Sequence, residues 1–254
     1  MRIGKQDLRS SAISTSTPET ITVRGRDLCG ELIGTTDFTS YFWLLVTGEA
    51  PSETQRFFAD AVLTAIAEHG LVPSVVAARM TYAAAPEAFQ GAVAAGLLGC
   101  GTVVLGSAEA AGRFLHDIVE SGEAPAAAVA RLRAGKRAIP GFGHPLHAGG
   151  DPRANVLLRL AAEKGVEGKH IGALRAVEAA LPHALGRALP INVNGAIPAV
   201  MLDVGFPLGA LKGISLLART ASLIAHLNEE SERPIGFVLS GEAAAAIDYD
   251  GPEG

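Results

Sequence analysis

Residues 140–147 read Pro-Gly-Phe-Gly-His-Pro-Leu-His, and residues 151–153 read Asp-Pro-Arg. Gly141 and Gly143 carry no Cβ atom, so a ligand can lie directly against the backbone there, and both can adopt dihedral angles that other residues avoid. His144 precedes a proline, which pushes its backbone toward extended conformations and fixes the direction of a side chain that titrates near neutrality. This loop therefore presents a candidate catalytic histidine.

The Asp-Pro-Arg segment has the features of a helix start. Asp151 is a favourable N-cap residue and Pro152 a favourable first helical residue. Arg153 should then project from the first turn of a new helix. This placement would hold an anion-binding guanidinium beside the loop.

The composition is typical of a mostly helical protein. Of the 254 residues, 48% are hydrophobic and only 5% are aromatic. Alanine, leucine and valine dominate the hydrophobic set, which favours close-packed helices over a sheet with large aromatic pairs. A chain of this length can bury an adequate core as one large domain or two small ones.

The pattern of apolar residues predicts most of the helices. A capping box at Ser52-x-x-Gln55 marks one helix start, Pro182 should interrupt a later helix, and Glu232-Arg233-Pro234 should break the longest one. A short strand is expected at 21–23 after an N-terminal arm of about twenty residues, and the tail from Asp248 is polar. The expected helices cover residues 39–46, 52–66, 86–98, 109–119, 124–134, 153–165, 177–181, 195–205 and 208–228.

Several function classes lack support in the sequence. No apolar run approaches a membrane span and no signal-peptide core is present, so we expect a cytoplasmic protein without a membrane partner. The net charge of −5 argues against general nucleic-acid binding. No glycine fingerprint follows a strand, so a nucleotide-binding site of the Rossmann or P-loop type is not indicated. Cys29 and Cys100 lack metal-site spacing, which favours reduced thiols, and no metal is expected.

The Gly-Phe-Gly-His-Pro motif, with an arginine nine positions after the histidine, resembles the citrate synthase superfamily. Other landmarks of that family occur in the same order along nearly the whole chain. The alternative is a Gly/Pro turn with a surface histidine. The resemblance implies an all-α fold and an obligate homodimer, with a large domain of residues 1–106 and 207–254 enclosing a small domain of residues 107–206.

The resemblance also implies residues that bind carboxylates. His69 lies at a helix end, where the helix dipole favours a cation, and the family has an oxaloacetate-binding histidine at this place. Arg219 lies among apolar residues, where its charge needs a partner, either an acidic side chain or a substrate carboxylate. Arg153, Arg219 and Arg233 match family arginines, and the family contributes the last of these across the dimer interface.

Basic residues precede the glycine loop. Lys136, Arg137, Arg131 and Arg133 would suit the phosphates of coenzyme A, whose adenine could rest on the backbone of Gly141 and Gly143. A solvated basic face is the alternative explanation. Coenzyme A is expected as part of the substrate.

The sequence departs from the family at two places. Citrate synthases carry a histidine in Gly-x-x-His-Gly-Gly-Ala-Asn, whereas residues 104–109 read Val-Leu-Gly-Ser-Ala-Glu, and Leu105 cannot donate a hydrogen bond. An apolar residue there resembles the citryl-CoA lyase branch, which includes the lyase module of ATP-citrate lyase. The aspartate of that branch's Asn-Val-Asp-Gly segment is replaced by Asn194, and an amide has no useful pKa for acid–base work.

The resemblance therefore implies a citryl-CoA lyase-like enzyme that cleaves a citrate-type CoA thioester to oxaloacetate and acetyl-CoA. His144 would act on the tertiary hydroxyl and Asn194 would orient the enolate. Two alternatives remain: a condensing citrate or 2-methylcitrate synthase, against which both departures count, and a weakly catalytic protein that binds an acyl-CoA or a carboxylate.

Overall fold

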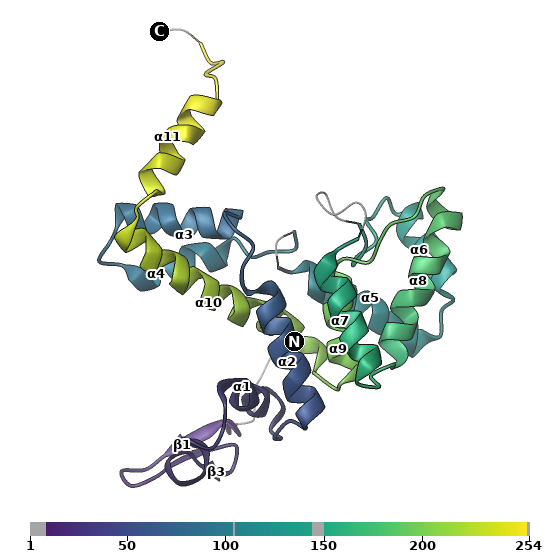
Figure 1. Ribbon diagram of the computed structural model, residues 1–254, viewed down its shortest axis with the longest axis horizontal. Coiled ribbons are helices and arrows are strands. Elements are labelled where there is room, and N and C mark those ends of the chain that lie inside the picture. Colours follow the sequence, from purple (N-terminus) through teal and green to yellow (C-terminus); the bar gives the residue numbers. More distant parts are fainter. Residues whose placement is uncertain (1–8, 104, 144–149, 253–254) are drawn as a thin grey trace. The chain divides into compact units, whose positions relative to one another are not determined.

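The computed structural model describes residues 9–103, 105–143 and 150–252 (Figure 1). The chain forms two compact units, residues 1–60 and residues 61–254. Helix α2 (Glu53–Ala67) begins in the first unit and ends in the second.

The first unit contains a small antiparallel sheet in the order β1-β2-β3. Its strands are β1 (Ser14–Ser16), β2 (Ile21–Val23) and β3 (Arg26–Asp27). The strand expected at residues 21–23 is confirmed, whereas the expected arm is wrong for residues 14–16, which pair with it. The turn between them is closed by Thr17, whose hydroxyl accepts from the Thr20 amide at 3.0 Å. Such a local side-chain bond gives the arm a reason to fold back.

Two short helical elements complete this unit. They are the π-helix η1 (Leu28–Leu32) and α1 (Phe38–Thr47). Asp37 caps α1 by accepting from the Ser40 amide, and Gly48 ends it in the left-handed region at φ 88°. Val23, Leu32 and Leu44 form one buried hydrophobic cluster of this unit.

The second unit is built from helices (Figure 1). They are α3 (Pro73–Ala84), α4 (Phe89–Leu98), α5 (Ser107–Ser121), α6 (Pro125–Ala134), α7 (Pro152–Glu163), α8 (Lys169–Leu185), α9 (Val193–Asp203), the 3-10 turn η2 (Leu208–Ala210), α10 (Leu211–Glu232) and α11 (Gly236–Ala246). Helices α3, α4 and α10 pack together, and α5, α6, α7, α8 and α9 pack with one another.

Helix α3 has no counterpart among the helices that the sequence pattern predicts. Its buried face consists of Ser74, Val75, Ala78 and Arg79, so polar residues interrupt the apolar periodicity. The face is nevertheless covered, because Val75 and Ala78 pack with Leu223 and Leu227 of α10. Tertiary contacts, rather than local pattern, therefore stabilise this helix.

Helix α8 corrects a second expectation, because it runs from Lys169 through Pro182 to Leu185. Pro182 is exposed and lies in the last turn, so the carbonyl that it leaves without an amide donor can be solvated. At the other end of the helix, the buried Asp203 carboxylate accepts from the amides of His170 and Ile171, both at 2.9 Å. A distant carboxylate thus serves as the cap of α8.

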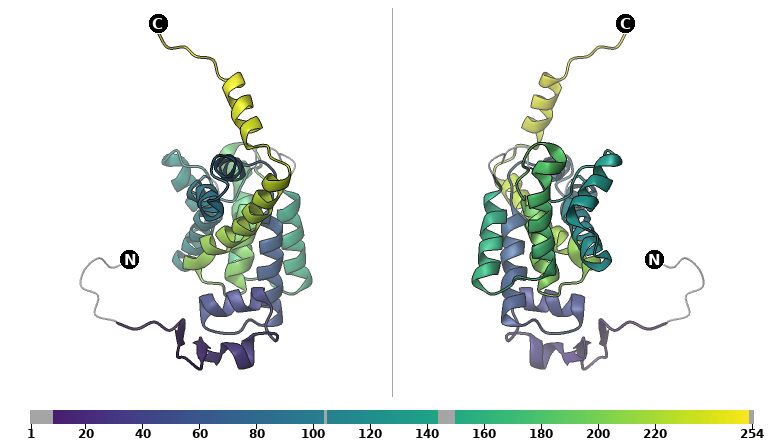
Figure 2. Two further views of the ribbon diagram at one scale, coloured as in Figure 1. Left: turned by 90° about the vertical axis from the view of Figure 1, so that its left-hand side faces the viewer. Right: turned by 90° about the vertical axis from the view of Figure 1, so that its right-hand side faces the viewer.

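The C-terminal part of the second unit consists of η2, α10 and α11. Leu208–Glu232 is the one helical segment among the described residues that is long and apolar enough, by length and composition, to cross a membrane, contrary to the expectation that no apolar run approaches a membrane span. The same helix packs on α3, α4 and α5. Helix α11, which was not predicted, follows α10 (Figure 2) and contacts α3.

Candidate functional site

The glycine loop is held by the segment that leads into α9. Phe142 and Ile191 form an antiparallel bridge. The Gly143 amide donates to the Pro190 carbonyl at 2.8 Å, and the Asn192 amide donates to the Gly141 carbonyl at 3.0 Å. The Asn192 side chain adds a bond from Nδ2 to the Gly143 carbonyl at 2.6 Å. The backbone on the N-terminal side of His144 is therefore fixed on residues 190–192.

Gly141 and Gly195 meet at this junction. Gly141 lies in the left-handed region at φ 88°, and a Cβ atom added to it would lie 2.8 Å from the Cα of Gly195. A Cβ atom on Gly195 would lie 2.5 Å from the Gly141 carbonyl oxygen. Only glycine at both positions lets the first turn of α9 approach the loop this closely.

We expect Gly195→Ala to lower the free energy of unfolding by about 1–3 kcal/mol, because its methyl group meets backbone atoms that cannot rotate away. Urea denaturation followed by circular dichroism measures this change. Gly172→Ala is the matched control, since a Cβ atom at that helical glycine meets nothing within 4 Å. Equal stability of the two variants would contradict the packing argument.

Asp151 joins the loop region to two helices. Its carboxylate is fully buried and caps α7 by accepting from the Arg153 amide at 3.1 Å, as the sequence predicted. It also accepts from Arg153 Nε and Nη2, both at 3.0 Å, and from the Val193 amide at 2.9 Å. Burial alone would raise the pKa of Asp151, but these hydrogen bonds and the charge of Arg153 outweigh it and lower the pKa. One ionised carboxylate thus positions the first turns of α7 and α9.

These contacts bring four of the expected site residues together: Gly141, Gly143, Arg153 and Asn194. Arg153 lies in the first turn of α7, and Asn194 lies half-buried in the first turn of α9. His144 lies outside the described residues. The functional role of each remains a prediction.

A basic cavity of about 340 Å³ lies beside the loop. Arg133, Arg137 and Arg187 line it together with Phe142 of the loop itself. Lys136 is adjacent in sequence to Arg137 but is not among the residues that line the cavity, and its backbone is left-handed at φ 53°. Arg131 instead pairs with Glu123 at 2.8 Å on the surface. Two of the basic residues expected to bind phosphate thus line one cavity.

Arg187 was not identified from the sequence. It follows Gly186, the left-handed C-cap of α8, and is separated by fifty residues from Arg137. Only the packing of α6 on α8 brings these two arginines to one cavity. A glycine stop followed by an arginine is the sole local signal, and it is too common to indicate a site.

A second group of expected residues surrounds the end of α2. His69 is exposed, and its amide donates to the Glu68 carboxylate at 2.8 Å. Arg219 of α10 is 3% exposed and donates to the Ser222 hydroxyl at 3.3 Å. Its Nε has no hydrogen-bond partner among the described residues. A guanidinium can only donate, so this Nε is available for an acceptor such as a carboxylate.

Arg233 lies at the C-terminal end of α10 and is exposed. Its carbonyl oxygen accepts from Nη2 of the buried Arg79 at 3.3 Å. Arg79 is also paired with Glu230 at 2.6 Å and Glu229 at 2.7 Å. The backbone of Arg233 is therefore anchored while its side chain faces solvent.

Leu105, which the sequence resemblance aligns with the family histidine, has a left-handed backbone at φ 64°. This conformation costs a leucine about 1–2 kcal/mol. The half-buried side chain presents an apolar surface and no donor.

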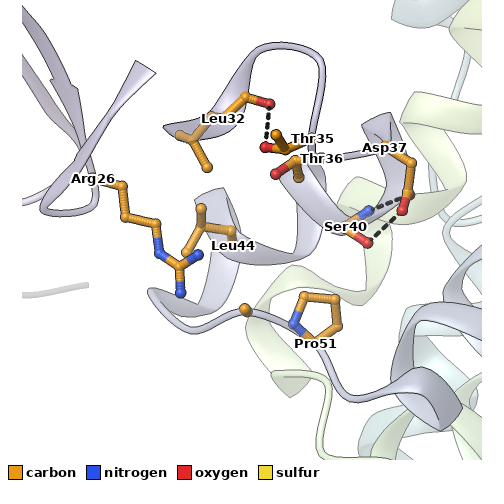
Figure 3. A pocket seen from close by; sticks show the side chains of 9 residues that line it. Arg26, Leu32, Thr35, Thr36, Asp37, Ser40, Leu44 and Pro51 are labelled. Carbon is orange, nitrogen blue, oxygen red and sulfur yellow. Dashed lines mark hydrogen bonds between the residues drawn. The ribbon is translucent and has the colours of Figure 1, made fainter. Parts of the chain in front are cut away.

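The first unit holds a smaller cavity of about 150 Å³, between β3, η1 and α1 (Figure 3). Arg26, Asp37 and Ser40 supply polar groups to its lining. The Asp37 carboxylate accepts from the Ser40 amide at 2.9 Å and from the Ser40 hydroxyl at 2.8 Å (Figure 3). The carboxylate serves as the cap of α1, so its contacts are structural.

Among residues 9–103, 105–143 and 150–252, no group of three or more His, Cys, Asp or Glu side chains is arranged to hold a metal ion. Cys29 is an exposed free thiol and Cys100 a buried one. Burial raises the pKa of the Cys100 thiol, although the positive charges of Arg219 and Lys212 act to lower it.

Comparisons with known proteins place this fold. Residues 34–235 match the family described as citrate synthase, C-terminal domain. The citrate synthase of Haloferax volcanii is 27% identical over 196 residues, which cover 75% of this chain and 51% of that protein. The chain thus spans about half the length of this relative.

Two solved structures are similar along nearly the whole chain. The citryl-CoA lyase from Hydrogenobacter thermophilus is 28% identical with a TM-score of 0.89, and the match covers 96% of this chain and 95% of that one. The ATP citrate lyase from Methanothrix soehngenii, in complex with citrate and coenzyme A, is 24% identical with a TM-score of 0.83; the match covers 99% of this chain and 43% of that one. The predicted all-α, citrate synthase-like fold is confirmed.

Proposed function

The chain belongs to the citrate synthase family, and we propose that it is a citryl-CoA lyase-like enzyme, cleaving a citrate-type CoA thioester to oxaloacetate and acetyl-CoA. The observation that carries this proposal is the likeness to the Hydrogenobacter thermophilus citryl-CoA lyase over 96% of this chain and 95% of that one. Leu105 supports cleavage over condensation, because it replaces a histidine that a condensing enzyme uses. Asn194 counts against condensation too, but it also departs from the aspartate of the lyase branch.

The proposed reaction begins at the tertiary hydroxyl of the substrate. His144 accepts the hydroxyl proton while the bond from the hydroxyl carbon to the thioester methylene breaks. The hydroxyl carbon becomes the carbonyl of oxaloacetate, and the electron pair of the broken bond passes to the thioester as an enolate. The side-chain amide of Asn194 donates to the enolate oxygen, and water or another group protonates the methylene carbon.

The remaining residues bind the two ends of the substrate. His69, Arg153, Arg219 and Arg233 hold the carboxylates. Lys136 and Arg137, with the glycine backbone at 141 and 143, hold coenzyme A. The basic cavity lined by Arg133, Arg137 and Arg187 supports this assignment, because guanidinium groups bind phosphate through paired hydrogen bonds. The arginines supply the positive charge, so the scheme needs no metal.

Incubation with citryl-CoA, followed by measurement of released oxaloacetate, tests the proposal. Rapid release supports a lyase. Formation of citryl-CoA or citrate from oxaloacetate and acetyl-CoA, faster than cleavage, would support a synthase instead. Tight binding of citryl-CoA without turnover would support the binding role, which the loss of the family aspartate at Asn194 favours.

We expect a stable homodimer, in which Arg233 reaches the active site of the neighbouring subunit. The C-terminal region exposes apolar side chains on α11 and just after it, at Phe237, Val238 and Ile247. Contact with a second subunit would bury this apolar surface. Sedimentation velocity at micromolar concentration measures the mass of the assembly. A folded monomer that still turns over citryl-CoA would contradict this expectation, because it would show that the active site does not need Arg233 from a neighbouring subunit.

The proposed domain arrangement is that of the family, with residues 107–206 as the small domain and residues 1–106 and 207–254 as the large one. The mutual packing of α5, α6, α7, α8 and α9 supports the small domain, and the packing of α10 on α3 and α4 supports the return of the chain to the large domain.

Asn194→Asp should raise the exchange of acetyl-CoA methyl protons with solvent, on the order of 10²-fold, because it restores a carboxylate where the family keeps its base. NMR in deuterated buffer measures the exchange, and mass spectrometry of the same preparation verifies residue 194, since Asn-Gly pairs are prone to deamidation. Unchanged exchange in a folded variant would contradict a simple loss of the base and favour another acyl-CoA substrate.

A further inference from the structure

The Glu68 carboxylate accepts hydrogen bonds from two segments of the second unit. Its Oε1 accepts from the amides of His69 at 2.8 Å and Gly70 at 2.5 Å. Its Oε2 accepts from the Ser222 hydroxyl at 2.6 Å and from His226 Nε2 at 3.0 Å. One side chain therefore joins the His69 turn, at the end of α2, to α10.

Ser222 extends this connection to Arg219. Its hydroxyl accepts from Arg219 Nη1 at 3.3 Å while it donates to Glu68. An arginine can only donate, so the direction of both bonds is fixed. The buried guanidinium is thereby held on one side by Ser222, and its Nε has no protein acceptor among the described residues.

His226 extends the connection to the turn that carries Arg233. Its Nδ1 lies 3.2 Å from Nη1 of Arg79, which can only donate, so Nδ1 must be unprotonated. Its Nε2 faces the Glu68 carboxylate and must carry the proton. Arg79, 2% exposed, then reaches Glu230 and the carbonyl oxygen of Arg233.

Burial would raise the pKa of Glu68, but the bonds from Ser222, the Gly70 amide and His226 outweigh it and lower the pKa to about 2. The carboxylate is therefore ionised throughout the neutral range. It can accept at both oxygens at once, which no neutral side chain of the same shape can do.

We infer that Glu68 is a positioning residue for the carboxylate end of the substrate. Through its two oxygens it sets the His69 turn and, by way of Ser222, the Arg219 guanidinium. Through His226 and Arg79 it also connects to the segment that carries Arg233. This inference rests on the proposed function, because it assigns these residues to one bound carboxylate group.

The binding test uses Glu68→Gln and Ser222→Ala, with Glu163→Gln as the matched control. Glutamine replaces one acceptor oxygen with a donor, so it must face either the two amides or the Ser222 and His226 donors with an N–H group. Ser222→Ala leaves the amides of the His69 turn bonded to Glu68, but it removes the donor to Glu68 Oε2 and the acceptor of Arg219 Nη1. Glu163 pairs only with Arg159 on the surface of α7 among the described contacts.

Calorimetric titration with oxaloacetate and, separately, with coenzyme A gives the decisive comparison. We expect oxaloacetate to bind roughly 10- to 100-fold more weakly to Glu68→Gln and roughly 3- to 10-fold more weakly to Ser222→Ala, whereas binding of coenzyme A changes less than about twofold. The Glu163→Gln control should match the wild type for both ligands. Equal weakening of both ligands, or unchanged oxaloacetate binding, would overturn the inference.

The tautomer of His226 supplies a readout that does not depend on activity. Nitrogen-15 NMR of the wild-type protein at pH 7 should show Nε2 protonated and Nδ1 unprotonated, and this state should be lost in Glu68→Gln. A protonated Nδ1 in the wild type would overturn the hydrogen-bond chain itself. If the wild type shows the expected tautomer but binds no oxaloacetate, the proposed function fails, and with it the role of Glu68 toward substrate.

Discussion

Replacing His144 with alanine is expected to lower kcat for citryl-CoA cleavage about 10²–10⁴-fold, the range that a positioned acid–base group contributes. The reaction needs a group that takes the proton of the tertiary hydroxyl as the carbon–carbon bond breaks. A histidine suits this role, because an ordinary imidazole changes its charge between pH 5 and pH 8.

Steady-state release of oxaloacetate measures the effect, and urea denaturation should show little change in the free energy of unfolding. His183→Ala, an exposed histidine near the end of α8, is the matched control and should keep wild-type turnover. A His144→Ala enzyme with wild-type kcat would assign the proton transfer to another group.

Local features of the fold could be predicted from the sequence. The Ser52–Gln55 capping box forms as expected, with the Ser52 amide donating to Gln55 Oε1 at 2.8 Å and the Gln55 amide donating to the Ser52 hydroxyl at 3.2 Å. Asp151 caps α7 and Pro152 opens it. These features depend on residues within one helical turn, so a short stretch of sequence contains all the information that they require.

Features that depend on distant partners could not be predicted in this way. The ion pair of Arg79 with Glu230 spans 151 positions, and it explains why a polar residue lies on the buried face of α3. The bond from Ser222 to Glu68 spans 154 positions. A single sequence gives the residue types but not which helices meet, and so the role of Glu68 emerges only from the packed structure.

In the candidate site, too, the residue types could be predicted from the sequence but their contacts with distant residues could not. Asn192 is the first residue of the segment that resembles the family's Asn-Val-Asp-Gly, and in the structure its side chain donates to the Gly143 carbonyl and anchors the loop. Asp151 was recognised as a cap, but its bond to the Val193 amide also fixes the first turn of α9, where Asn194 lies. The sequence therefore indicates a cap at Asp151 and a family segment at Asn192, but not the contacts that these two side chains make with distant residues.

Asp151→Ala is expected to destabilise the protein by about 2–4 kcal/mol, since it removes a fully buried carboxylate from its ion pair with the partly exposed Arg153. The variant also leaves the Val193 amide without its acceptor and α7 without its cap. Urea denaturation at pH 7 measures the loss, and Glu163→Ala, which removes an exposed pair in the same helix, should cost less than about 1 kcal/mol.

The pH dependence of stability separates this electrostatic role from simple loss of packing. The pKa of Asp151 is lowered in the folded protein, so the folded state binds fewer protons than the unfolded state in the acidic range. Its contribution to stability is complete above the unfolded pKa, near 3.8, and is lost as the pH falls through the lower folded pKa. The difference in unfolding free energy between the wild type and Asp151→Ala should therefore be largest above about pH 5 and shrink toward pH 2. A difference that stays constant from pH 7 to pH 2 would mean that the carboxylate acts through its volume alone, and that its bonds to Arg153 and Val193 contribute nothing to the position of α7 and α9.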